Sequence, residues 1–172
     1  MDIRLRSRLA NITTFVFDVD GVFTDATLIV SENDVLRTFN VRDGYAIQMA
    51  LKQGYNIAVI TGGKQQSIAT RLHGLGIKDV FLNAGTDQKL EVYNGYLEKN
   101  NIEAAHTVFV GDDIPDYLVM KYTETLAACP FDAVEEVQSI ADYISDKCGG
   151  DGVVRDVIEL VMKAQDKWLK VF

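Results

Sequence analysis

Cysteine and histidine are scarce in this sequence. Its 172 residues include two cysteines, Cys129 and Cys148, and two histidines, His73 and His106, all far apart. So few thiols exclude a disulfide framework, and isolated side chains of both types lack the ligand spacing of a zinc site. We therefore expect a reducing, cytoplasmic compartment.

A long apolar run is also missing. Charged residues interrupt the apolar ones in segment 1–9, which predicts a short amphipathic helix rather than a signal peptide or a membrane span. The sequence therefore predicts no contact with a membrane.

Positively charged residues are fewer than negatively charged ones. The chain has 17 Lys and Arg residues against 25 Asp and Glu residues, a formal net charge of −8. This balance argues against a general nucleic-acid surface, so we expect no nucleic-acid partner. An anionic small molecule would need local cations, either a bound metal or a few placed Lys and Arg side chains.

The pattern of apolar residues predicts one α/β domain over residues 1–172. Apolar residues make up 48% of the chain, and no proline-rich linker, low-complexity tract or repeat divides it. Short buried runs alternate with amphipathic segments. The predicted strands are 15–17, 56–60, 80–82, 107–110, 125–129 and 143–144, and the predicted helices are 44–52, 64–75, 88–99, 114–122, 134–140 and 153–170. This order predicts a doubly wound, mainly parallel, Rossmann-like sheet with its ligand crevice beyond the carboxyl ends of the strands.

A β-hairpin is predicted between the first strand and the first helix of this series. Two extended runs, 28–30 and 35–40, flank the polar turn 31–34. The interval from residue 20 to residue 61 accommodates this small flap and one helix. It leaves little room for a separate cap domain.

The first strand ends in two carboxylates spaced one residue apart, Asp18 and Asp20. Alternate side chains of a strand point to the same side, so the two charges are held together. Such a pair is costly unless a cation or a shared proton relieves it, which predicts a metal-assisted or acid/base site. The alternative is a solvated acidic pair at an Asp-Gly turn.

Two later positions carry weaker signals. Thr61 follows the strand 56–60 and precedes Gly62 and Gly63, so its hydroxyl and nearby backbone amides could bind phosphate at a helix start. An ordinary helix cap is the alternative. Lys89 begins the helix 88–99, where a solvated charge is the ordinary interpretation.

A glycine-led acidic cluster follows the strand 107–110. Asp112, Asp113 and Asp116 come directly after Gly111. Carboxylate oxygens of this kind suit Mg²⁺, whereas Zn²⁺ would recruit His or Cys. At least one of the three is expected to cap the following helix, because a helix N-terminus attracts negative charge.

In chain order, these elements resemble the haloacid dehalogenase superfamily over nearly the whole chain. The motifs are Asp18-Val19-Asp20-Gly21, then Thr61, Lys89 and Gly111-Asp112-Asp113-Ile114-Pro115-Asp116. Two further segments narrow the resemblance to the capless 3-deoxy-D-manno-octulosonate 8-phosphate phosphatases. They are Phe39-Asn40-Val41-Arg42-Asp43-Gly44-Tyr45, and Gly149-Gly150-x-Gly152 followed by Val154-Arg155.

The resemblance implies a role for each matching residue. Asp18 would attack phosphorus, and Asp20 would protonate the departing alkoxide and later activate water. Mg²⁺ would be held by Asp18, the backbone carbonyl of Asp20, and Asp112, with Asp113 and Asp116 in support.

Phosphate binding is implied for a second group of residues. Thr61 and Lys89 match the hydroxyl and cation of the family, and Gly62 lies beside them. Arg42 is a further candidate for an anion contact, although a surface ion pair suits it equally well.

The resemblance also implies a substrate and an assembly. The substrate would be a phosphorylated 2-keto-3-deoxy sugar acid, with the eight-carbon acid favoured over a nine-carbon one, and related capless enzymes are homotetramers whose subunits cover one another's sites. Two positions depart from the subgroup, which commonly has Arg where this chain has Gly63 and Asp151. Both replace a cation that could hold a sugar acid.

Two other classes of protein remain as alternatives. A receiver domain also places a phosphorylated Asp, an acidic pair, Thr and Lys on an α/β sheet, but in a different order along the chain. A noncatalytic interaction module with the same fold is the other, and the intact pair Asp18 and Asp20 argues against it.

Overall fold

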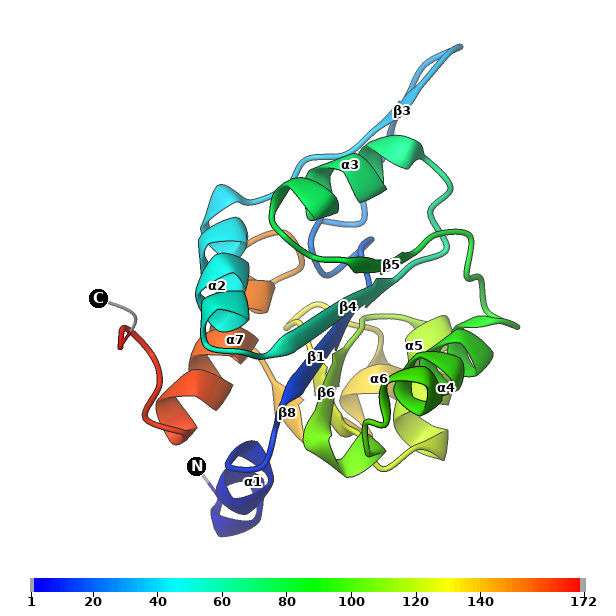
Figure 1. Ribbon diagram of the computed structural model, residues 1–172. Coiled ribbons are helices and arrows are strands. Elements are labelled where there is room, and N and C mark those ends of the chain that lie inside the picture. Colours follow the sequence, from blue (N-terminus) through cyan, green and yellow to red (C-terminus); the bar gives the residue numbers. More distant parts are fainter. Residues whose placement is uncertain (1, 171–172) are drawn as a thin grey trace.

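The structure is a computed structural model that describes residues 2–170. Its centre is a six-stranded parallel sheet with helices on both faces, in the order β5-β4-β1-β6-β7-β8 (Figure 1). The strands are β5 (Asp79–Phe81), β4 (Asn56–Ile60), β1 (Thr14–Phe17), β6 (Thr107–Val110), β7 (Leu126–Cys129) and β8 (Tyr143–Ile144). The predicted doubly wound α/β fold without a separate cap domain is confirmed.

Strand β1 lies between β4 and β6, and all of its residues are buried. Its side chains alternate between the two faces of the sheet. Phe15 and Phe17 join one hydrophobic cluster, whereas Val16 joins the other. A strand buried on both faces reads as a continuous apolar run, which is why the run before Asp18 marks the centre of the sheet.

The helices divide between the two faces of the sheet (Figure 1). On one side lie α1 (Ile3–Leu9), α2 (Val41–Lys52), α3 (Gln66–Gly74) and α7 (Val153–Ala164). On the other lie α4 (Lys89–Asn100), α5 (Ile114–Tyr122) and α6 (Glu135–Gln138), and a 3₁₀ turn at Ala104–His106 precedes β6. None of the helices between residues 2 and 170 is both long enough and apolar enough to cross a membrane.

The largest differences from the predicted helix boundaries are at the start of α2 and the end of α7. Helix α2 begins at Val41 rather than at residue 44, because the side chain of Asn40 caps it by accepting the backbone N–H of Arg42. Helix α7 ends at Ala164 rather than at residue 170, because Asp166 adopts a left-handed conformation with φ of 55°. The N–H of Lys167 then donates to the carbonyl of Met162, which closes the end of α7.

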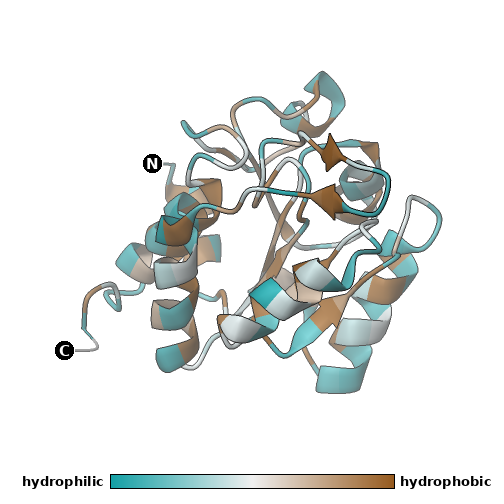
Figure 2. Ribbon diagram, turned by 90° about the horizontal axis from the view of Figure 1, so that it is seen from above, coloured by the Kyte–Doolittle hydropathy of each residue, from teal (hydrophilic) through white to brown (hydrophobic). Residues whose placement is uncertain are grey.

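The hairpin is formed by β2 (Ile29–Val30) and β3 (Val35–Leu36), which pair in antiparallel fashion. It projects from the body of the molecule in Figure 1, and its two strands are hydrophobic in Figure 2. The side chains of Ile29, Val30 and Leu36 are exposed in the isolated chain. The predicted second strand, 35–40, is shorter than expected because β3 pairs only with the two residues of β2, and Asn40 already caps α2.

The glycine-rich segment before α7 packs against the loop that follows β1. Gly150 donates its N–H to the carbonyl of Val22, and its own carbonyl accepts from Asn40. A Cβ atom at Gly149 would lie 2.1 Å from the carbonyl oxygen of Gly21, so no larger residue fits without backbone movement. The segment is therefore a fixed contact of the loop that carries Asp20, and not a free turn.

We expect the substitution Gly149→Ala to destabilise the protein by about 1–3 kcal/mol, because the added methyl group overlaps a backbone carbonyl. The measurement is the free energy of unfolding in urea. Gly95→Ala is the matched control, since a Cβ atom at this position of α4 meets nothing within 4 Å. The control should be neutral or stabilising by up to about 1 kcal/mol, as expected for Gly in a helix interior. Equal stabilities of the two variants would contradict the close contact at Gly149.

Candidate active site

The carboxyl ends of three adjacent strands carry the predicted site residues. Asp18 follows β1, Thr61 follows β4, and Asp112 follows β6 after one glycine. The ladder continues one residue beyond β1, because the N–H of Asp18 donates to the carbonyl of Val110. Parallel pairing of β1 with both neighbours thus brings three positions far apart in the sequence to one edge of the sheet.

These side chains line one cavity of about 320 Å³. Its walls include every predicted site residue except Arg42. The lining residues are Asp18, Asp20, Ala26, Thr61, Gly62, Gly63, Ala84, Gly85, Thr86, Lys89, Asp112, Asp113, Pro115 and Asp116. Five carboxylates and one ammonium group therefore share this small space.

The loop after β1 is shaped to let Asp112 approach it. The carbonyl of Val19 accepts the N–H groups of Val22, Phe23 and Thr24, which forms a tight turn. Gly21 has φ of +83°, and a Cβ atom there would lie 2.0 Å from Oδ2 of Asp112. Glycine is required at this position both for its backbone conformation and for the approach of the Asp112 carboxylate.

Lys89 is the centre of an ion-pair network. Its ammonium group lies 2.7 Å from Oδ1 of Asp116 and 3.1 Å from Oδ2 of Asp18, and its side chain is 2% exposed. Burial alone would lower the pKa of Lys89, but the charges of Asp116 and Asp18 outweigh burial and raise it. Lys89 therefore remains charged and holds the two carboxylates together.

Asp113 and Asp116 hold the start of α5 in place. Oδ1 of Asp113 accepts the N–H of Ile114, and Oδ2 of Asp116 accepts the N–H groups of Asp112 and Asp113. This capping box agrees with the prediction that at least one of the three acids caps the helix. Both oxygens of Asp116 are thus engaged, one by Lys89 and one by the backbone.

The site offers two unused buried oxygens to a cation. Asp18, Asp112 and Asp116 each place one oxygen within 4.8 Å of the others. Among the described residues, Oδ1 of Asp18 and Oδ1 of Asp112 are buried without a hydrogen-bond partner. An unpartnered buried carboxylate oxygen is costly, and a hard divalent cation such as Mg²⁺ relieves it. The donor set therefore fits Mg²⁺ at Asp18 and Asp112, with Asp116 behind them.

The pKa values of these acids reflect the same crowding. Burial, followed by the charge of Asp116, raises the pKa of Asp18 to about 7, and Lys89 opposes this rise. Burial and the charges of Asp116 and Asp18 raise the pKa of Asp112 to about 8. A bound cation would lower the pKa values of both carboxylates, because it favours their ionised forms.

Asp20 has a partner that the sequence analysis did not identify, Arg37. Nε of Arg37 lies 2.6 Å from Oδ1 of Asp20, and Nη2 lies 2.9 Å from Oδ2. The hydrogen bond with Asp20 raises the pKa of Arg37, so the guanidinium is charged. The position of Arg37 within the predicted flap strand 35–40 was the available signal, but nothing in the local sequence indicates which acid it reaches.

Thr61 is placed to donate a hydrogen bond into the cavity. Its side chain is buried, and Oγ1 accepts the N–H of Gly63 at 3.1 Å. The hydroxyl proton is then available to an anion beside Gly62, which also lines the cavity. This geometry fits the predicted phosphate contact better than a helix cap, because Gln65 is the cap residue of α3.

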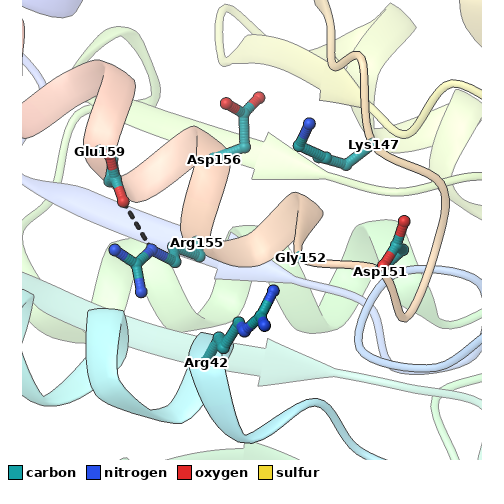
Figure 3. A pocket seen from close by; sticks show the side chains of 7 residues that line it. All are labelled: Arg42, Lys147, Asp151, Gly152, Arg155, Asp156 and Glu159. Carbon is teal, nitrogen blue, oxygen red and sulfur yellow. Dashed lines mark hydrogen bonds and ion pairs between the residues drawn. The ribbon is translucent and has the colours of Figure 1, made fainter.

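Arg42 lines a second cavity of about 400 Å³ between α2 and α7, apart from Asp18. Figure 3 shows its side chain extending from α2 toward the start of α7, below Arg155, whose Nε donates a hydrogen bond to Glu159 at 2.6 Å. Asp151, one of the two positions where the subgroup commonly has Arg, also lines this second cavity. The structure therefore does not bring Arg42 or Asp151 to the carboxylate cluster within one chain.

The raised pKa of Asp112 predicts how metal affects stability. Because its folded-state pKa of about 8 lies above the ordinary value of 3.8, its contribution to stability is full at low pH and lost as pH rises through about 8. In EDTA, we expect Asp112→Asn to gain stability relative to the wild type between about pH 5 and pH 8. Excess Mg²⁺ should stabilise the wild type at pH 8 and leave the variant nearly unchanged.

Urea unfolding at both pH values, with EDTA or Mg²⁺, measures this effect. Glu98→Gln removes an exposed carboxylate of α4 and serves as the control that should follow the wild type. A stability difference between Asp112→Asn and wild type that is independent of both pH and Mg²⁺ would contradict the assignment of Asp112.

Comparisons with known proteins agree with this geometry. Residues 44–124 match the family model described as haloacid dehalogenase-like hydrolase, a range that includes Thr61, Lys89 and the acidic cluster. The chain is 38% identical to 3-deoxy-D-manno-octulosonate 8-phosphate phosphatase KdsC of Salmonella typhi, over 94% of this chain and 85% of that protein. Identity to KdsC of Escherichia coli K12 is 36% with the same coverage.

Solved structures show the same fold. The 3-deoxy-D-manno-octulosonate 8-phosphate phosphatase of Yersinia pestis superposes with a TM-score of 0.91 at 32% identity, over 97% of this chain and 89% of that one. The enzyme of Moraxella catarrhalis, in complex with magnesium ion, phosphate ion and KDO, gives a TM-score of 0.89 at 31% identity, over 95% of this chain and 92% of that one. The chain thus belongs to the family of the 3-deoxy-D-manno-octulosonate 8-phosphate phosphatases, within the haloacid dehalogenase-like hydrolases.

Proposed function

We propose that this protein is a Mg²⁺-dependent phosphomonoesterase that hydrolyses a phosphorylated 2-keto-3-deoxy sugar acid, 3-deoxy-D-manno-octulosonate 8-phosphate. The observation that carries the proposal is the arrangement of Asp18. Its Oδ2 lies 3.1 Å from Lys89, and its Oδ1 is buried without a hydrogen-bond partner, as is Oδ1 of Asp112 in the same cavity. The curated relatives named for this activity, which match 94% of the chain, support it.

Asp18 is the nucleophile in this proposal. An oxygen of its carboxylate forms a bond to phosphorus while the bond from phosphorus to the sugar oxygen breaks. Lys89 lies 3.1 Å from Oδ2 of Asp18, so its charge stabilises the ionised carboxylate before attack. The buried backbone around Asp18 fixes its direction, because its N–H is part of the sheet ladder.

Asp20 transfers the protons. It gives a proton to the departing sugar oxygen in the first displacement and then takes one from the attacking water. The oxygen of that water bonds to phosphorus as the bond to Asp18 breaks, which releases phosphate, restores the carboxylate of Asp18 and leaves Asp20 protonated for the next cycle. Asp20 suits both steps because it lines the cavity from the loop directly after Asp18.

Charge balance explains the need for a divalent cation. The cavity walls hold five carboxylates against the ammonium of Lys89, so a phosphate group entering alone would be repelled. When bound at Asp18, Asp112 and the carbonyl of Asp20, Mg²⁺ supplies the positive charge that screens the phosphate oxygens. Thr61, Gly62 and Lys89 complete the phosphate site in this proposal.

The eight-carbon substrate predicts a specific ranking of activities. With Mg²⁺, we expect the purified protein to hydrolyse 3-deoxy-D-manno-octulosonate 8-phosphate with a kcat/KM at least about tenfold above those of the nine-carbon analogue and of simple sugar phosphates. Phosphate release measures all of them, and EDTA should abolish turnover.

The substitution Asp18→Asn tests the role of Asp18 as the nucleophile. It should lower kcat by about 10³-fold or more while the protein stays folded, because the amide cannot act as the nucleophile. A preference for the nine-carbon ester would contradict the proposed substrate but not the proposed reaction. Undiminished turnover by Asp18→Asn would remove the nucleophile from this position, and phosphorylation of Asp18 without turnover would favour a receiver role.

We also propose that the protein is a cytoplasmic homotetramer assembled through the hairpin. Leu28, Ile29, Val30 and Leu36 are between 43% and 71% exposed on this projecting element, an apolar surface that a monomer would leave in water. The cysteines are unpaired, Cys129 buried and Cys148 partly so, which suits a reducing compartment.

The assembly is tested by sedimentation velocity. The wild type should sediment as a tetramer, and Ile29→Ser together with Val30→Ser should shift it to smaller species, because the exposed apolar area is lost. Ile3→Ser, at an 86% exposed residue on α1, is the control that should leave the sedimentation coefficient unchanged. A wild-type monomer at micromolar concentration would contradict the proposal.

A further inference from the structure

Arg37 connects the hairpin to the centre of the site. It lies directly after β3, its side chain is 6% exposed, and its guanidinium donates to both oxygens of Asp20. Nη1 donates to the side chain of Gln65 at 2.9 Å, at the start of α3. One side chain thus joins three separate segments: the hairpin, the loop after β1 and the start of α3.

The contact has the geometry of a positioning device. Two parallel N–H···O bonds fix both the place and the plane of a carboxylate, which a single charge on a flexible chain does not. Among the described residues, the only other side-chain hydrogen bond of the Asp20 carboxylate is a long one, 3.5 Å from Oγ1 of Thr24. Arg37 is therefore the group that determines where the carboxylate of Asp20 points.

This contact bears on proton transfer. Asp20 must carry a proton to the departing sugar oxygen and then receive one from water, so the direction of its oxygens sets the efficiency of both steps. The guanidinium also donates a hydrogen bond to the side chain of Gln65. Because Gln65 is uncharged, it does not compete with Asp20 for the positive charge of Arg37. Movement of the hairpin would be transmitted to Asp20 through this one side chain.

We propose that Arg37 is a positioning residue that holds Asp20 in place for proton transfer and couples its orientation to the hairpin. This inference rests on the proposed function, because it assigns Asp20 the acid and base roles. Arg37 acts through Asp20 and forms no bond to the reacting phosphorus.

Leaving groups of different acidity test the role of Arg37. An alkyl phosphate needs a proton from Asp20 as its ester bond breaks, whereas p-nitrophenyl phosphate releases a stable anion. In Arg37→Gln, we expect kcat/KM to fall by about 10- to 100-fold for the alkyl phosphate and by less than about threefold for p-nitrophenyl phosphate. Arg37→Lys keeps the charge but not the paired geometry, and should lie between Arg37→Gln and the wild type.

A double-mutant cycle separates positioning from a general structural effect. If Arg37 acts through Asp20, then Arg37→Gln should have no further effect on kcat/KM for the alkyl phosphate in an Asp20→Asn background. Equal falls for the two leaving groups, or a full additional loss in the Asp20→Asn background, would overturn the proposal. Arg4→Gln removes an exposed arginine of α1 and is the control for loss of one positive charge.

Hydrogen exchange tests the link to the hairpin without turnover. Backbone amides of residues 29–36 should exchange faster in both Arg37→Gln and Asp20→Asn, and no faster in the double variant. Glu32→Gln, an exposed hairpin residue, should match the wild type. Unchanged exchange in Arg37→Gln would overturn the coupling.

Inactivity of the wild type on every ester would overturn the proposed function as well, whereas activity without leaving-group dependence overturns only the role of Arg37.

Discussion

The buried ion pairs of Lys89 hold the site together. Its ammonium group joins the end of β1, through Asp18, to the first turn of α5, through Asp116, and Lys89 itself begins α4. Removing one member of a buried charge network leaves its partners uncompensated, at a cost of about 3–5 kcal/mol. Asp116 also binds the backbone of Asp112 and Asp113, so the same network places the next carboxylate. The positions of Asp18, Asp112 and Asp116 thus depend on one lysine.

Two glycines, Gly21 and Gly149, allow close contacts around the loop after β1 and so support the ion-pair network of Lys89. Gly21 lets the carboxylate of Asp112 approach the loop after β1, and Gly149 lies against the carbonyl of Gly21 from the other direction. The aromatic ring of Phe23 packs against Phe17 and Phe39 and anchors the same loop in the core. These backbone contacts and buried rings keep the loop, and with it Asp20, close to Asp18. The orientation of the Asp20 carboxylate is then set by Arg37.

Patterns within a few residues predicted most of the fold and the carboxylate cluster. Apolar runs that end in Asp18, Thr61 and Asp112 mark strands, and parallel pairing brings their ends together. The pairing of Arg37 with Asp20 was not predictable, because it depends on how a projecting hairpin folds back on the loop after β1. Arg42 shows the reverse: its short motif suggested an anion contact, but the start of α2 directs it to another cavity. Local motifs report strand ends well, whereas contacts of long side chains depend on the packing between elements.

The departures from the subgroup pattern around position 63 have a packing explanation. A Cβ atom at Gly63 would lie 3.4 Å from Nη2 of Arg37 and 2.5 Å from Cδ1 of Ile68. The overlap is with the side chain of Ile68, whereas the guanidinium of Arg37 lies at an ordinary contact distance from this Cβ position. The positive charge beside Asp20 comes from the hairpin through Arg37, so the electrostatic surroundings of this carboxylate depend on where the hairpin lies.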